Sequence, residues 1–170
     1  RYRRDFGMKV IDDFLPQEDY KLIRDTMFSS NFPWYFANSV VSKDLLCTEQ
    51  ENYQFGHSFY FNYGFKSENA QMLIPILEKL NPSAILRIKG TLLPRSEKTI
   101  EHGYHLDNES NTPAAIYYIN TNNGYTNFKK GGKINSVANR LVLFNTSEYH
   151  TGATCTDEKV RVLINFNYYS

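Results

Sequence analysis

The spacing of apolar residues changes at Ala84, and this change constrains the fold more than any other feature of the sequence. Before Ala84, two segments carry apolar residues at helical spacing; after it, short segments alternate apolar and polar residues with period two and are separated by turn residues. Several short strands joined by turns predict an antiparallel sandwich or barrel. Because the helical segments come first, we expect the helices to cover one outer face of the β-structure.

The first half of the chain is predicted to form two helices and a few strands. A helix is expected from Pro16 to about Ser29, because proline suits a first helical turn and acidic residues follow it at the positive end of the helix dipole. A second helix is expected over 72–80, and Pro75 inside it either restarts or kinks that helix. Strands, or aromatic loops in their place, are expected at 8–14, 32–36 and 52–65.

The second half is predicted to be almost entirely β-structure, with Gly-, Asn- and Pro-rich turns between its strands. The expected strands cover 84–92, 103–108, 114–120, 133–137, 140–145 and 159–168, with turns at 108–113, 121–124, 129–132 and 151–158.

Length and charge exclude several classes of protein. A chain of 170 residues suits one domain with a core of its own. With 19 Lys and Arg against 18 Asp and Glu, no surplus of positive charge indicates nucleic acid, and no apolar run approaches the roughly 20 residues of a membrane helix. Cys47 and Cys155 lack neighbours at zinc-ligand spacing, so we expect two free thiols in a reducing compartment, with one long-range disulfide as the alternative.

His105 and Asp107 are the first candidates for chemistry. They lie two residues apart in the predicted strand 103–108, and residues i and i+2 of a strand point to the same side. An imidazole and a carboxylate aimed at one point supply two ligands of a metal site. A second histidine from another strand would complete a 2-His-1-carboxylate triad, which leaves positions on Fe(II) open for other ligands. His150, after the apolar strand 140–145, is the candidate.

Arg161 is the second candidate, because it opens the last predicted strand and shares one face of that strand with Leu163 and Asn165. The alternate residues are apolar and suit packing against the helices. A buried arginine is costly unless it meets a carboxylate, which its planar fork matches with two hydrogen bonds. A dicarboxylate that chelates iron at one end and meets Arg161 at the other would offset this cost.

Several short motifs between Ile85 and Tyr168 occur in an order that resembles the catalytic half of the 2-oxoglutarate/Fe(II)-dependent dioxygenases. The similarity is greatest to the prolyl-4-hydroxylase-like branch, which includes small bacterial and viral proteins, and the first half of the chain resembles that branch as well. Each motif is weak alone, and their common order carries the resemblance. They are HLDN at 105–108, IYYIN at 116–120, GGKI at 131–134, NRLVLF at 139–144, His150 and Arg161.

The resemblance implies roles for individual residues. His105, Asp107 and His150 would bind Fe(II), and Arg161 would pair with the distal carboxylate of 2-oxoglutarate. Tyr118, the second tyrosine of IYYIN, would donate a hydrogen bond to the same carboxylate.

One position departs from the pattern of that family. Related enzymes often carry a tyrosine near the cosubstrate shortly before the first histidine ligand, and here Arg95 stands at that position. Arg87, Lys89 and Thr91 on the preceding strand are alternatives that could make this contact, and the sequence does not choose among them.

The resemblance also implies a fold and an activity. The fold would be a mainly β double-stranded β-helix, or jelly roll, spanning 1–170 as one domain, with support from 1–83 and a catalytic core in 84–170. The reaction would hydroxylate a C–H bond, using 2-oxoglutarate and O₂ and releasing succinate and CO₂, with ascorbate as a reductant. The substrate stays open between a prolyl or other peptidyl residue, a small molecule, a nucleobase and a sugar.

Environment and rival functions are also expectations at this stage. We expect a cytoplasmic protein of a bacterium or of a virus-infected host cell, with no membrane partner, although a removed targeting segment remains an alternative. The oligomeric state is left open. The rival functions are a non-catalytic jelly-roll binding or structural module and a cupin-like metalloenzyme that does not use 2-oxoglutarate.

Other notable side chains are predicted to have ordinary roles. His102 lies three residues before His105, so in a strand it would face the opposite side, and we expect it at the rim of the cavity. His57 is expected to be a plain strand or loop histidine. Trp34 and Tyr104 could line a groove, but core packing or a surface position is the simpler interpretation.

Overall fold

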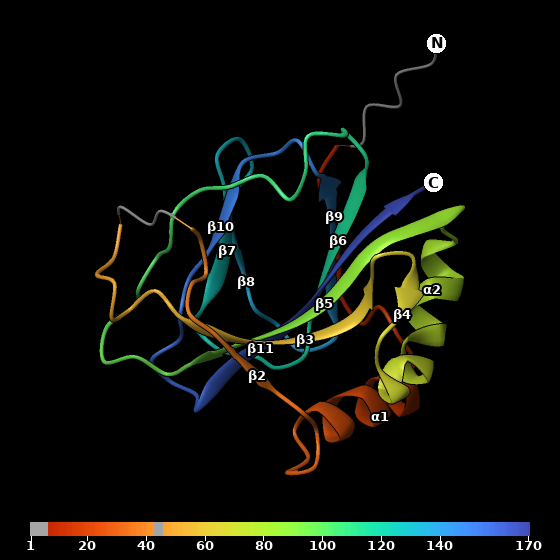
Figure 1. The fold of residues 1–170 in the computed structure, drawn as a ribbon, viewed down its shortest axis with the longest axis horizontal. Helices are drawn as coiled ribbons and strands as arrows, with labels where there is room; N and C mark the ends of the chain where they lie inside the picture. Colours follow the sequence, from red (N-terminus) through yellow and green to blue (C-terminus); the bar gives the residue numbers. More distant parts are fainter. Residues whose placement is uncertain (1–6, 43–45) are drawn as a thin grey trace.

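The computed structural model describes residues 7–42 and 46–170, which form two antiparallel sheets and helices packed outside them (Figure 1). In chain order the elements are β1 (Lys9–Ile11), α1 (Gln17–Met27), β2 (Tyr35–Ala37), β3 (Gln54–Phe61), β4 (Gly64–Phe65), the 3₁₀ helix η1 (Glu68–Leu73), α2 (Ile74–Leu80), β5 (Ala84–Pro94), β6 (Pro113–Tyr118), β7 (Tyr125–Phe128), β8 (Gly132–Asn135), β9 (Arg140–Asn145), β10 (His150–Gly152) and β11 (Val160–Tyr169).

The strand order is that of a jelly roll and not of a simple meander. The larger sheet runs β1-β9-β6-β11-β5-β3-β2, with β4 paired to β3, and the smaller sheet runs β10-β7-β8. Neighbours in the larger sheet are far apart in sequence: β11, the last strand, lies between β5 and β6. The predicted mainly β jelly roll is therefore confirmed.

The helices cover one face of the larger sheet, as predicted (Figure 1). Ile23 of α1 and Ile76 of α2 are fully buried in one core with Phe59, Ile164 and Phe166 of the sheet. Removing such side chains from water supplies roughly 1.5–3 kcal/mol each, so this interface holds the larger sheet in place.

The helix boundaries differ slightly from those predicted. Pro16 precedes the first turn of α1 instead of lying in it. The second predicted helix is two elements, because a 3₁₀ helix ends at Leu73 and α2 begins afresh with Pro75 in its first turn. Asn81, with a left-handed backbone (φ 47°), ends α2. No helix in the described ranges is long and apolar enough to cross a bilayer.

The strand predicted at 103–108 is wrong. This segment makes a single bridge, from His105 to His150, and a second bridge joins the preceding Glu101 to Ala153. The facing strand β10 has three residues, so it offers too few partners to extend a ladder along the segment. The strands β7 and β10, which belong to the smaller sheet, were missed because segments of four and three residues are too short to display a period of two.

The last strand places alternate residues inside the molecule as predicted. Val162, Ile164 and Phe166 face the helices, and the intervening residues face the space between the two sheets. β5 contributes a matching row, because Leu93 lies beside Arg161 and Lys89 beside Asn165 in the antiparallel register. Two adjacent strands thus present polar side chains to the interior of the jelly roll.

The two cysteines both lie in the described part of the chain, and they form no disulfide. Cys155 is buried, and the sulfur of Cys47 lies 3.6 Å from Nδ1 of His102. This agrees with the expected pair of thiols.

Candidate active site

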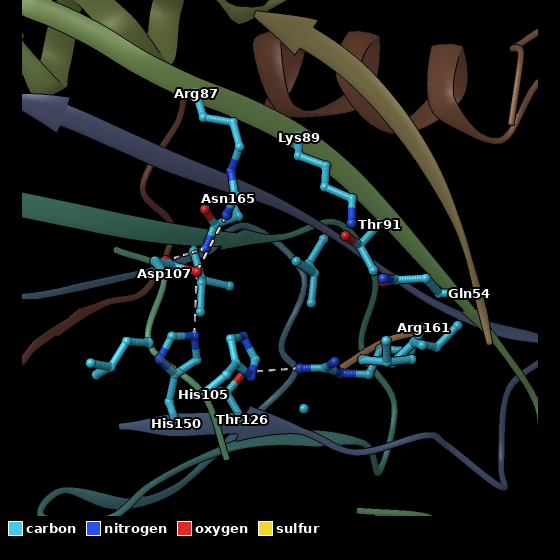
Figure 2. A pocket seen from close by; sticks show the side chains of 16 residues that line it. Gln54, Arg87, Lys89, Thr91, His105, Asp107, Thr126, His150, Arg161 and Asn165 are labelled. Atoms are coloured by element: carbon cyan, nitrogen blue, oxygen red, sulfur yellow. Dashed lines mark hydrogen bonds and ion pairs between the residues drawn. The ribbon is translucent and has the colours of Figure 1, made fainter. Parts of the chain in front are cut away.

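A cavity of about 190 Å³ opens between the two sheets (Figure 2). The larger sheet supplies its wall from β5, β6 and β11, and the smaller sheet supplies Thr126, His150 and Gly152. Half of the charged or polar lining residues come from alternate positions of β5 and β11, and for these residues the alternation explains why they share one side. The lining residues that carry charge or can bind metal are Arg87, Lys89, His105, Asp107, His150 and Arg161.

His105, Asp107 and His150 converge at one end of this cavity. One ligand atom from each lies within 4.8 Å of the other two. Nε2 of His150 is 3.8 Å from Oδ1 of Asp107, and the two imidazole rings are 4.7 Å apart between centroids. The backbones of His105 and His150 exchange two hydrogen bonds of 3.0 and 3.1 Å. A bridge between distant segments, not a shared strand, therefore positions these ligands.

Both histidines are oriented through the ring nitrogen that faces away from this point. Nδ1 of His105 lies 3.3 Å from the Gly103 carbonyl, and Nδ1 of His150 lies 3.0 Å from the Glu148 carbonyl. A carbonyl can only accept, so each Nδ1 carries the hydrogen and each Nε2 keeps a lone pair. Burial, and then the neighbouring His150, lower the pKa of His105, which keeps its imidazole neutral and able to bind metal.

Asp107 is held ionised by three donors. Nδ2 of Asn167 and Nδ2 of Asn165 donate to Oδ2 at 2.9 and 3.1 Å, and Arg87 donates to Oδ1 at 3.3 Å. Burial by itself would raise the pKa of Asp107, but His150, Arg87 and the two amides outweigh it and leave that pKa below its ordinary value. The amides occupy Oδ2, so Oδ1 faces the histidines.

Arg161 lies at the other end of the cavity and is 1% exposed. Nε donates to Ser136 Oγ at 2.8 Å, and a terminal nitrogen donates to Thr126 Oγ1 at 3.0 Å. Among the described residues no carboxylate pairs with it. Burial lowers the pKa of Arg161, which expresses the cost of this uncompensated charge.

Two glycines make room for the Arg161 side chain. A Cβ on Gly124 would lie 2.6 Å from Cδ of Arg161, and a Cβ on Gly152 would lie 3.3 Å from its terminal nitrogen. The first contact is shorter than atoms tolerate, so only glycine at position 124 permits the observed course of the arginine.

Tyr118 is brought next to Arg161 but is not among the residues that line the cavity. Its hydroxyl donates to Thr126 Oγ1 at 2.7 Å, and the Arg161 guanidinium lies 5.6 Å from its ring centroid. Thr126 thus accepts from both Tyr118 and Arg161, and its own hydroxyl hydrogen remains to be donated to a ligand. The threonine lies between the tyrosine and the cavity, a relation the sequence pattern could not indicate.

Several other expectations are corrected by the positions of the side chains. His102 is fully buried and does not line the cavity, so the predicted rim position is wrong; its Nδ1 lies 3.6 Å from the sulfur of Cys47. Arg95 also lies outside the cavity, and Leu93, at the end of β5, occupies the wall beside Arg161. Arg87 on β5 and Asn167 on β11 both contact Asp107, and no sequence motif indicated these contacts.

His57 and Trp34 are structural, in agreement with the simpler interpretation. Both ring nitrogens of His57 are used, at 2.7 Å from the Pro33 carbonyl and 2.7 Å from Ser67 Oγ. Trp34 donates to the Met27 carbonyl at 3.2 Å.

Known structures share this arrangement of sheets over nearly the whole chain. A Pseudomonas putida prolyl-4-hydroxylase superposes with a TM-score of 0.61 and 14% identity, covering 96% of this chain and 93% of that one. A Trichoplax adhaerens prolyl hydroxylase in complex with a hypoxia-inducible factor peptide gives 0.65 and 14%, covering 97% and 84%. A Burkholderia pseudomallei oxidoreductase of the 2OG-Fe(II) oxygenase family gives 0.65 and 11%, covering 98% and 86%.

The chain has the fold of the 2-oxoglutarate/Fe(II) oxygenases. No protein-family sequence model and no curated protein sequence matches it. At identities of 11–14%, the fold is shared without extended sequence similarity.

The residues present suit the groups that this oxygenase fold binds in other proteins. Two imidazoles and one carboxylate form the donor set of non-haem Fe(II) sites, and His105, Asp107 and His150 would hold such an ion between them. The guanidinium of Arg161, which pairs with no carboxylate in the described part of the chain, and the hydroxyl hydrogen of Thr126 suit a carboxylate at the other end of the same cavity. A small dicarboxylate that binds metal satisfies both ends.

Proposed function

We propose that this protein is an Fe(II)- and 2-oxoglutarate-dependent dioxygenase that hydroxylates a C–H bond of its substrate, and that residues 1–170 form one such catalytic domain. The observation that carries the proposal is Arg161. It is a buried cation without a carboxylate among the described residues, and it lies in the cavity that holds the His105, Asp107 and His150 cluster. Such a charge is tolerated when a ligand compensates it.

In the proposed reaction, His105, Asp107 and His150 hold the metal through two Nε2 atoms and one carboxylate oxygen. Bound iron, with 2-oxoglutarate and O₂, supplies the oxidising chemistry, in which the cosubstrate becomes succinate and CO₂ and one oxygen atom enters the substrate. Asn165 and Asn167 keep Oδ2 of Asp107 occupied, which fixes the direction of the coordinating oxygen.

At the other end, Arg161 and Thr126 would bind the distal carboxylate of the cosubstrate. Ser136 holds the guanidinium in place, and Tyr118 orients Thr126, so the role expected for Tyr118 is exercised through the threonine. Leu163 and Ile116 line the wall between the two ends, and apolar walls exclude water from a site where electrostatic interactions must be strong.

The first candidate for the substrate is a peptidyl prolyl residue. Its support is by analogy, since two of the proteins with this fold are prolyl hydroxylases, one of them seen with a peptide. Ascorbate is proposed as an external reductant and has no residue assigned to it.

An anaerobic titration tests the proposal. Fe(II) and then 2-oxoglutarate are added to the purified protein, and the visible metal-to-ligand charge-transfer band is followed. We expect a band in the wild type, none in His150→Ala, and a much weaker affinity in Arg161→Ala. Folded, iron-loaded protein that gives no band would reject 2-oxoglutarate as cosubstrate. If Arg161→Ala leaves the affinity for 2-oxoglutarate unchanged, the role proposed for the arginine is rejected.

Metal-dependent release of succinate on admission of O₂ separates an enzyme from a binding module. A cupin-like metalloenzyme that ignores 2-oxoglutarate would bind iron and yet release no succinate.

A further inference from the structure

Lys89 is a third cation of the cavity beside Arg87 and Arg161, and the proposed reaction assigns it no role. Its side chain projects from β5 into the space between the sheets, toward Thr91 and Gln54 and across from the two histidines (Figure 2). Within the described ranges its ammonium has no hydrogen bond or ion pair. Burial, and then the positive charge of Arg87, lower the pKa of Lys89 against the opposing effect of Asp107.

The neighbouring strand is shaped around this lysine. Gly56 of β3 lies opposite Thr91, and a Cβ on Gly56 would approach Cε of Lys89 to 3.2 Å. The glycine leaves space for the lysine stem to lie along the wall and direct its ammonium inward. Gln54, the next inward residue of β3, donates its amide to the Ser39 carbonyl at 3.0 Å. The ammonium and the Thr91 hydroxyl therefore form a donor-rich position on this wall.

The charges of the cavity do not balance without a further anion. Asp107 is the one carboxylate among the described lining residues, against the cations Arg87, Lys89 and Arg161. Fe(II) and a doubly charged cosubstrate would add no net charge. The cavity would therefore keep two positive charges in excess. Arg87 contacts Asp107 at 3.3 Å and Arg161 would face the distal carboxylate, whereas Lys89 meets no carboxylate among the described residues.

We propose that Lys89, with Thr91, binds a carboxylate of the primary substrate, so that the protein acts on a molecule carrying an acidic group near the C–H bond that reacts. The inference rests on the proposed function, because that function assigns both ends of 2-oxoglutarate to other residues. Lys89 lies beside Asn165 in the register of β5 and β11, and Asn165 contacts Asp107. Lys89 is therefore level with the proposed metal end of the cavity. An anion bound there would hold the substrate beside the reacting centre.

The test uses protein loaded with Mn(II) and saturating 2-oxoglutarate, with acetate as the probe and acetamide as its neutral match. Mn(II) is paramagnetic, so it speeds the relaxation of the methyl protons of any probe bound near it. Saturating 2-oxoglutarate keeps acetate away from Arg161, and the comparison with Lys89→Met separates acetate held by the lysine from acetate bound to the metal. The variants are Lys89→Met, Lys89→Arg and, as a control, Lys66→Met, which removes an exposed lysine on the surface. Circular dichroism verifies that each variant folds.

We expect saturable relaxation of acetate but not of acetamide in the wild type and in Lys66→Met. Lys89→Met should weaken acetate binding about tenfold or more, as for the loss of one hydrogen bond to a charged group, and Lys89→Arg should retain most of it. Equal relaxation in the wild type and Lys89→Met, or none in the wild type, would overturn the proposal.

Failure of the proposed function gives a different result in the same samples. If 2-oxoglutarate displaces no water from bound Mn(II), the water relaxation stays unchanged and the cosubstrate assignment fails, whatever acetate does. If Lys89→Met weakens 2-oxoglutarate and leaves acetate unaffected, the lysine serves the cosubstrate, and the assignment to the substrate is overturned.

Discussion

Replacing Arg161 by methionine should separate ligand binding from stability. Methionine keeps much of the apolar stem and removes the charge. Without ligand, the variant loses two hydrogen bonds from a charged donor, worth about 1.5–3 kcal/mol each, to Ser136 and Thr126. It also escapes the burial of an uncompensated guanidinium, which costs several kcal/mol. These effects oppose each other, so the ligand-free free energy of unfolding should stay within about 1 kcal/mol of the wild type or rise.

With 2-oxoglutarate bound, the wild type should be the more stable of the two proteins. At a 2-oxoglutarate concentration of about 100 times its Kd, the wild type gains about 2.7 kcal/mol, which is about 5–10 °C in Tm for a chain of this size. The variant lacks the paired hydrogen bonds from the guanidinium to the distal carboxylate, so its affinity should fall about 100-fold or more. The same concentration then adds about 0.4 kcal/mol.

The assay is denaturant unfolding of both proteins under anaerobic conditions with Fe(II), with and without 2-oxoglutarate. The reasoning is supported if the variant is about as stable as the wild type, or more stable, without 2-oxoglutarate and less stable than the wild type with it. A loss of about 2 kcal/mol or more in the ligand-free variant, together with an undiminished gain from 2-oxoglutarate, would show that Arg161 is a structural cation and refute its assignment as a ligand-binding group.

Three further predictions follow from single contacts. Gly124→Ala should weaken 2-oxoglutarate about tenfold or more by displacing Arg161, whereas Gly7→Ala, with nothing within 4 Å, should not; equal affinities in calorimetry would contradict this. Burial lowers the pKa of His105 in the folded protein, so the metal-free protein should keep its full free energy of unfolding above about pH 6.5 and lose part of it as the pH falls from there through the folded pKa. Denaturant unfolding at about pH 7.5 and about pH 5.5 should show a smaller loss in His105→Gln than in the wild type. Asn139→Ala should lower the free energy of unfolding by about 2–4 kcal/mol and leave the Kd of 2-oxoglutarate unchanged, because this buried amide joins the N-terminal segment to β6; a stable variant would contradict it.

The candidate ligands could be proposed from sequence, although part of the reasoning behind them was wrong. His105 and Asp107 were placed on one side because of an expected strand, and the structure has a loop there that makes one bridge to His150. The loop still directs both side chains to one point. The order of motifs selected the same three residues that the structure brings together, and it did not depend on the local strand being correct.

The alternation of side chains along β11 could be predicted from the sequence for a simple physical reason. One face must be apolar to pack on the helices, so Val162 and Ile164 indicated which side was buried, and Arg161 and Asn165 had to face the other way. A strand carries this information within itself.

Which strands are neighbours is not carried by any one of them. Arg87 reaches Asp107, and the Lys89 stem lies against Gly56, only because β5 pairs with β11 on one side and with β3 on the other. Pairing depends on closing long loops and burying the helices against the assembled sheet, which are properties of the whole chain. A period of two thus indicates that a side chain points inward, and the packing of distant segments determines what it meets there.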